Sequence, residues 1–259
     1  MSSHAHGFLS TWSLISRIPV PLKKEPDFAA AGFWMPIVGL GASAAACLGA
    51  WLGLLAFGPG LLAALVSIAA QYSTFNLFHL DGLLDTADAA GVSGDLAKRR
   101  EVLKDPRLGS YALLYGFLFL ASRLAATSAL LTHGATAAWA ALALAPVSGR
   151  FSSVLLTAFT EPYGHGGLAA LLGRPAPIKA TIGYAIASAP AVLLFGIAFG
   201  PIGAIASVLV GGTSAIITAA VVGHWYGKHL GGYSGDALGA TVELGELLIL
   251  VISVAIVSR

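Results

Sequence analysis

Seven apolar blocks of membrane-spanning length dominate the chain and limit the folds open to it. A transmembrane helix needs roughly 20 mostly apolar residues, and blocks near or above this length occupy 33–57, 61–80, 108–132, 136–158, 180–199, 203–223 and 238–257. Only 10% of the 259 residues are charged, against about a quarter in soluble domains. We therefore expect an all-α fold: a polytopic integral membrane helical bundle of about seven transmembrane helices, forming one domain over 1–259.

A shorter amphipathic stretch precedes the first block. Phe8, Leu9, Trp12 and Ile15 share one face of a helix predicted over 8–18, which Pro19 and Pro21 follow. This stretch is too short to span a bilayer, and tryptophan is enriched at membrane interfaces. It predicts an N-terminal interfacial helix anchored by Trp12.

Basic residues gather on one side of the seven-span arrangement. Of the 14 basic residues, all but Arg123, Arg150 and Arg259 fall in the N-terminal segment or in the long connections 81–107, 159–179 and 224–237, which leaves eleven; they include Lys98, Arg99, Arg100, Arg174 and Lys228. The positive-inside rule then places the N-terminus and these connections in the cytoplasm. The net charge of only +2 gives no indication of a nucleic-acid partner.

The segment His79-Leu-Asp-Gly-Leu-Leu-Asp-Thr-Ala-Asp88 carries the strongest chemical signal. On a helix, the spacing i, i+4, i+7 puts Asp81, Asp85 and Asp88 on one face. Carboxylates so placed repel one another, and a divalent cation relieves that repulsion. Oxygen-only ligands favour Mg²⁺, Mn²⁺ or Ca²⁺. The alternative is a solvated helix start with acids near the positive end of its dipole.

A second polar cluster follows the sixth block. Gly231, Gly232 and Gly235 allow a tight turn, and Asp236 comes next, near the predicted start of the last helix. Asp236 either completes a metal site with the first cluster or caps that helix. Glu243 and Glu246 lie farther along the same span, where carboxylates are costly and face a polar interior.

Several basic side chains are candidates for contacts with phosphate. Lys104 and Arg107 lie beside the third span, in a loop that also reads as an ordinary solvated segment. Arg123 and Arg150 fall inside spans and should face the bundle interior, where they pair with Glu243 or Glu246 or bind a substrate phosphate. His79 is a candidate ligand or base, or simply a donor to a neighbouring carbonyl.

These groups together indicate phosphoryl transfer at a membrane surface, with a metal neutralising phosphate charge. The chain has no P-loop, zinc-ligand spacing or serine nucleophile elbow, which disfavours an ATP-driven pump, a zinc peptidase and an esterase. Two rivals remain. A CDP-alcohol phosphotransferase should carry a longer series of spaced aspartates, and a transporter should carry polar residues through several spans.

The motifs resemble those of the cobalamin synthase (adenosylcobinamide-GDP ribazoletransferase) family, over nearly the whole chain. They are Ser16-Arg-Ile-Pro-Val-Pro21, Pro36-Ile-Val-Gly39, His79 to Asp88, Leu103-Lys-Asp-Pro-Arg-Leu-Gly109, Ser148-Gly-Arg150 and Leu230-Gly-Gly-Tyr-Ser-Gly-Asp-Ala-Leu-Gly239 with Glu243-Leu-Gly-Glu246. The resemblance implies a Mg²⁺-dependent enzyme of the bacterial cytoplasmic (inner) membrane. It would join adenosylcobinamide-GDP to α-ribazole or its 5′-phosphate and release GMP. Ala89 and Pro106 depart from the family pattern, where glycine and serine are common.

Combined with this resemblance, the clusters suggest a role for each candidate. Asp81, Asp85, Asp88 and Asp236 would hold Mg²⁺ against the substrate diphosphate, and Asp88 or Asp236 would act as general base. Arg107 and Arg150, with Lys104 as a lesser candidate, would hold phosphate oxygens. Glu243 and Glu246 would orient the arginines, and His79 would lie beside the cofactor. The glycine-rich spans are also compatible with a homo-oligomer.

Overall fold

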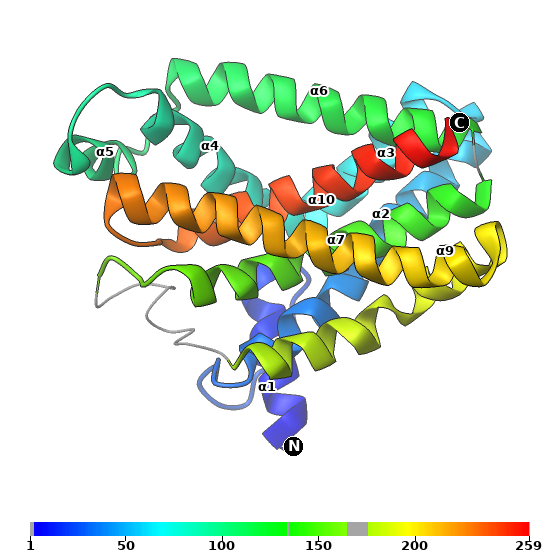
Figure 1. Ribbon diagram of the computed structural model, residues 1–259, viewed down its shortest axis with the longest axis horizontal. Helices are drawn as coiled ribbons and strands as arrows, with labels where there is room; N and C mark the ends of the chain where they lie inside the picture. The colour runs from blue at the N-terminus through cyan, green and yellow to red at the C-terminus, as the bar shows by residue number, and fades with distance from the viewer. Residues whose placement is uncertain (1–2, 134, 165–175, 259) are drawn as a thin grey trace.

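The computed structural model describes residues 3–133, 135–164 and 176–258. These residues form a helical bundle with no strand among them; an isolated bridge pairs Pro162 with Tyr233. The helices are α1 (Ser3–Ile15), α2 (Ala31–Phe57), α3 (Leu61–Gln71), the π turn η1 (Tyr72–Asn76), α4 (Leu77–Gly91), α5 (Leu96–Val102), α6 (Ser110–His133), α7 (Ala135–Phe159), α9 (Pro177–Leu230) and α10 (Gly235–Val257). The expected all-α membrane bundle is confirmed (Figure 1).

Within the described part of the chain, six continuous helical stretches are long and apolar enough to cross a membrane. One of them, α9, has 54 residues and would extend about 80 Å if straight, well beyond the roughly 30 Å of a hydrocarbon core. It folds back at Gly200, whose φ of 70° is outside the helical range, just before Pro201. Figure 1 shows the two arms, 177–199 and 201–230, running in opposite directions. Each of the seven predicted blocks therefore corresponds to a helical segment.

The helix ends differ from the prediction mainly on the side of the long connections. The stretch that begins at Leu61 continues to Gly91, beyond the predicted block end at residue 80. Asp81, Asp85 and Asp88 therefore lie on a helix, as their i, i+4, i+7 spacing indicates. The second arm of α9 likewise continues to Leu230, and Gly231 ends it in the left-handed conformation. Arg174, Arg259 and most of the connection 159–179 lie outside the described residues.

The N-terminal helix α1 is present, a few residues earlier than predicted, and Figure 1 shows it crosswise to the long helices. Trp12 packs edge-on against Phe75 of η1, with 5.1 Å between the ring centroids. Its indole nitrogen donates to the Ile18 carbonyl at 3.1 Å. Trp12 thus fastens α1 to the bundle, and its role as an interfacial anchor stays a prediction.

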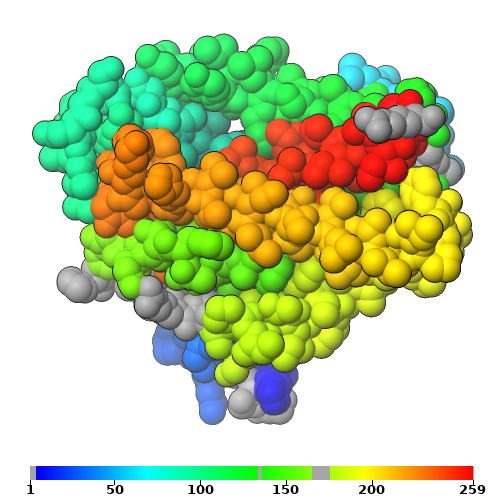
Figure 2. Space-filling model, viewed as in Figure 1, coloured from blue at the N-terminus to red at the C-terminus, as the bar shows by residue number. Residues whose placement is uncertain are grey.

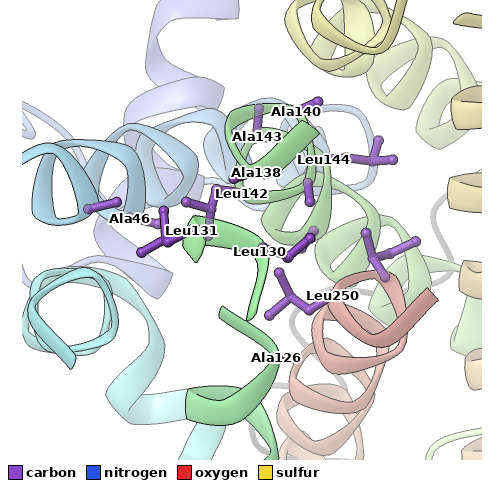
Figure 3. Close-up of a cluster of buried hydrophobic side chains, with 14 of the residues drawn as sticks. Ala46, Ala126, Leu130, Leu131, Ala138, Ala140, Leu142, Ala143, Leu144 and Leu250 are labelled. Atoms are coloured by element: carbon purple, nitrogen blue, oxygen red, sulfur yellow. The ribbon is translucent and has the colours of Figure 1, made fainter. Parts of the chain in front are cut away.

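Small side chains let α7 occupy the centre of the bundle. In its most apolar window 83% of residues are buried, against 11% for α9, which lies at the periphery. Ala138, Leu142 and Leu144 of α7 pack with Leu130 of α6 and Leu250 of α10 (Figure 3). The returning arm of α9 covers one side of this core beside α10 (Figure 2). Core alanines permit the close helix approach typical of membrane bundles.

Candidate active site

Two glycines allow α4 and α10 to approach at backbone distance. A Cβ placed on Gly82 would lie 2.8 Å from the carbonyl oxygen of Asp236, and one placed on Gly239 would lie 2.9 Å from that of His79. Real Cβ contacts are essentially never this short. The two sequence motifs therefore pack against each other, and a glycine of each lies against the backbone of a predicted site residue of the other.

This contact gathers carboxylates from both motifs. Asp85 lies within electrostatic range of Asp236, Asp81 and Asp88. Asp81 is exposed, and Asp85 and Asp236 are half-buried. The Ser234 hydroxyl donates to Asp236 at 3.0 Å. Asp236 therefore lies beside the first cluster, and its role in a metal site stays a prediction. We call Asp81, Asp85 and Asp236 the acid cluster.

Asp88 has a different set of partners from the other acids. One of its carboxylate oxygens accepts from the Gly109 amide at 2.7 Å and the other from the Ala112 amide at 2.8 Å. Both amides lie at the start of α6, where the first backbone N–H groups have no partner within the helix. Asp88 therefore caps α6 from α4, and its roles as metal ligand and base stay predictions.

The acid cluster fits a metal ion that shares its coordination with substrate. Across residues 3–133, 135–164 and 176–258, no three histidine, cysteine or acidic side chains form a group able to hold a metal alone. Mg²⁺ is commonly bound by one or two carboxylates plus substrate phosphates and waters. Oxygen-only donors at an accessible surface suit that mode, and an all-protein cage is not formed by the described residues.

Two of the five basic residues between positions 94 and 107 donate to carbonyl groups at helix ends. Arg100 donates to the Leu230 carbonyl at 2.7 Å, and Arg99 donates to the carbonyl of Ala89. Arg107 is exposed and pairs with Asp105, and their hydrogen bond lowers the pKa of that carboxyl to about 2. Lys104 is also exposed. Phosphate contacts by Arg107 and Lys104 stay predictions, and their exposure leaves both available.

Tyr163, in the connection after α7, adds an aromatic side chain beside the acid cluster. The Arg100 guanidinium carbon lies 4.6 Å from the centre of the Tyr163 ring. Burial and the neighbouring charge of Asp236 raise the pKa of Tyr163. Tyr163 thus lies between Arg100 of α5 and Asp236 of the acid cluster. These residues are far apart in the sequence, so this contact was not predictable from it.

A buried polar network lies deeper along the same helices. Arg123 pairs with Glu243 at 3.3 Å and also with Glu246, and Arg150 pairs with Glu246 at 2.9 Å. All four side chains are at most 2% exposed. The expected inward orientation and pairing of both arginines is confirmed. Because Arg150 also donates to Asn76 and to the Pro146 carbonyl, its role as a phosphate ligand stays a prediction.

We did not single out Gln71, Tyr72 and Asn76 from the sequence, and they complete this network. Gln71 donates to Glu246 at 2.8 Å, Tyr72 donates to Glu243, and Asn76 donates to both glutamates. Their polarity within an apolar block could have identified them, because polar residues within membrane spans face the bundle interior and pair with other polar groups. His79 is buried nearby with no hydrogen-bond partner on Nδ1 within the described chain, and its ligand role stays a prediction.

Comparison with known proteins identifies relatives over nearly the whole chain. The family model described as cobalamin-5-phosphate synthase matches residues 7–254. A protein of Chlorobium phaeovibrioides named adenosylcobinamide-GDP ribazoletransferase is 32% identical over 94% of both chains. One of the same name from Alkalilimnicola ehrlichii is 35% identical over 100% of this chain and 99% of its own. No solved structure matches significantly.

Proposed function

This chain belongs to the cobalamin-5-phosphate synthase family, and from that premise we propose that it is an adenosylcobinamide-GDP ribazoletransferase. It joins adenosylcobinamide-GDP to α-ribazole or its 5′-phosphate, releases GMP and forms adenosylcobalamin or its 5′-phosphate. The observation that carries this proposal is the α4–α10 contact, which gathers carboxylates from two distant motifs. Enzymes of phosphoryl transfer use such carboxylates to hold the metal ion that neutralises the negative charge of a diphosphate.

The residues divide into those that hold the diphosphate and one that takes a proton. Asp81 and Asp85 would hold Mg²⁺ against the diphosphate, and the bound ion would neutralise charge there. The acceptor hydroxyl attacks the phosphorus attached to cobinamide, and the bond from that phosphorus to the GMP oxygen breaks. We assign the hydroxyl proton to Asp236 rather than Asp88, because both Asp88 oxygens accept backbone hydrogen bonds.

The same arrangement supports a cytoplasmic orientation within the inner membrane. The acid cluster belongs to α4 and the first turn of α10. Figure 1 shows α4 running toward the end of the bundle where α5 lies, and α5 holds Lys98, Arg99 and Arg100. Basic connections stay in the cytoplasm. The reaction would then take place where the nucleotide substrates are made.

A product assay tests the proposed function. Purified protein in nanodiscs receives adenosylcobinamide-GDP and either acceptor, with Mg²⁺ or with EDTA. We expect metal-dependent GMP release matched by a cobalamin product, and about 100-fold or greater loss in Asp85→Asn. Asp27→Asn, an acid in the loop before α2, is the matched control and should retain activity. Absence of product with both acceptors, or full turnover by Asp85→Asn, would contradict the proposal.

A further inference from the structure

The helix that carries the acids contains one π turn. Residues Tyr72–Asn76 form η1 between α3 and α4, within one continuous helical stretch. A π turn accommodates one residue more than an α turn, and each residue advances an α-helix by about 100°. The direction in which Asp81 and Asp85 point relative to α3 therefore depends on this extra residue.

Asn76 fixes the π turn from inside the bundle. Its Nδ2 donates to Glu243 at 2.9 Å and to Glu246 at 3.0 Å. Its Oδ1 accepts from Arg150 at 3.0 Å and from Gln71 at 3.1 Å. The side chain is 0% exposed, so both ends of one amide are fully used by the buried network.

The N-terminal segment holds the same turn from the other side. The Arg17 amide donates to the Thr74 carbonyl at 2.8 Å, although the two residues belong to different elements. Trp12 packs on Phe75 in the same turn. A π turn alters the usual i to i−4 ladder, and the Arg17 contact gives the Thr74 carbonyl a partner outside the helix.

We propose that η1, fixed by Asn76, sets the rotation of α4 that turns Asp81 and Asp85 toward Asp236. Asn76 is then a positioning residue for the acid cluster. If the same residues formed an ordinary α turn, each α4 residue would take the orientation of its successor, and Asp81 would face α10 where Gly82 now lies. That place admits no side chain, because a Cβ there meets the Asp236 backbone at 2.8 Å. The α4–α10 contact would separate.

Asn76→Ala tests the rotation, because without the Asn76 hydrogen bonds η1 should relax to an α turn with the same number of residues. Deletion of Ser73 is the companion change, because it removes the extra residue. Ser73 is exposed, and its hydroxyl bonds only the Ala70 carbonyl within the described chain.

In a Cys47→Ala background, which removes the single cysteine, Ala89→Cys and Ala90→Cys report on the two neighbouring faces of α4. Ala89 is buried and Ala90 exposed, so a water-soluble thiol reagent should label only position 90. In Asn76→Ala we expect position 89 to take the exposed orientation of position 90 and become reactive. Deletion of Ser73 in the same variant removes the extra residue, so an α turn keeps the register and labelling should return to position 90 alone.

Should Asn76→Ala prevent folding, deletion of Ser73 alone is the second test, because an α turn without the extra residue keeps the register and only position 90 should be labelled. Labelling at position 89 in the folded deletion variant would overturn the proposal. In Asn76→Ala we also expect about 100-fold lower kcat with KM for α-ribazole within twofold, partly restored in Asn76→Gln. Wild-type labelling in folded Asn76→Ala would likewise overturn it, and Ser73→Ala is the control that should behave as wild type.

Only the prediction for kcat rests on the proposed function. The prediction for thiol labelling does not depend on it. A labelling shift with undiminished transfer would uphold the rotation and count against the acid cluster as the active site. A labelling shift accompanied by loss of transfer supports both.

Discussion

At the scale of single residues, carboxylates on one helix face do different work because their surroundings differ. Asp81 is exposed at the edge of the acid cluster, free to contact a ligand. Asp88, two turns on, has both oxygens committed to backbone amides at the start of α6. The regular spacing of the acids in the sequence therefore does not reveal their different roles. Asp81 is suited to binding a ligand, and Asp88 is suited to joining α4 to α6.

Substitution of these two acids should separate the two kinds of work. Asp88→Asn removes one acceptor from the α6 terminus, and we expect a loss of about 1 kcal/mol in stability, as for a removed helix cap. Asp81→Asn is the matched control and should lower transfer without lowering the melting temperature. Thermal unfolding in detergent measures the first effect and the product assay the second. Equal melting temperatures for both variants would refute the capping role.

The spacing of the acids could be predicted, and their partners could not. Periodicity is a local property, so i, i+4, i+7 correctly placed Asp81, Asp85 and Asp88 on one face. The partner of Asp88 is a helix terminus that begins after a loop and a short helix, and no local pattern encodes that meeting. Arg123 and Arg150 were predictable as inward residues because charge in a span is costly, but their acceptors included Asn76, which we had not considered.

At the scale of elements, the glycine contact between α4 and α10 controls the distance across the acid cluster. A methyl group at Gly82 would meet backbone atoms of Asp236, which cannot move aside as a side chain could. We expect Gly82→Ala to cost about 1–3 kcal/mol through overpacking, and to reduce transfer more strongly by separating Asp85 from Asp236.

Gly212→Ala provides the matched control for that change. Gly212 also lies in a long helix, α9, yet a Cβ placed there has no atom within 4 Å. It should match wild type in both melting temperature and product formation. Wild-type transfer by Gly82→Ala would show that the α4–α10 distance does not matter to the reaction.

The positions of the spans were predictable, and the helix ends on the side of the long connections were not. Hydropathy can be read directly from each stretch of sequence, and an apolar stretch of about 20 residues crosses a bilayer as a helix. Each predicted apolar block therefore corresponds to a helical segment. The helix through Asp88 and the arm ending at Leu230 continue past their apolar stretches because neighbouring elements stabilise them; Arg99 and Arg100 donate to their terminal carbonyl groups. The π turn at Tyr72 has no sequence signal of its own, because tertiary contacts hold it.

At the scale of the whole molecule, the buried network joins segments far apart in the chain. Arg123 of α6, Arg150 of α7 and two glutamates of α10 meet residues at the junction of α3 and η1. Two positive charges face two negative ones, so the network is formally balanced. Its members also hold Asn76, which connects the stability of the bundle to the geometry of the acid cluster.

Charge balance in this network should determine stability more than any single contact. Arg150→Met leaves Glu246 and Glu243 opposite one arginine, and breaking a buried pair costs about 3–5 kcal/mol. Arg150→Met with Glu246→Gln restores one positive and one negative charge, so we expect the double variant to melt above Arg150→Met alone. Lys24→Met, at an exposed position, controls for the loss of a basic residue. Melting temperatures in one detergent measure all four proteins, and a double variant no more stable than Arg150→Met would mean that hydrogen-bond geometry, rather than balanced charge, holds these helices together.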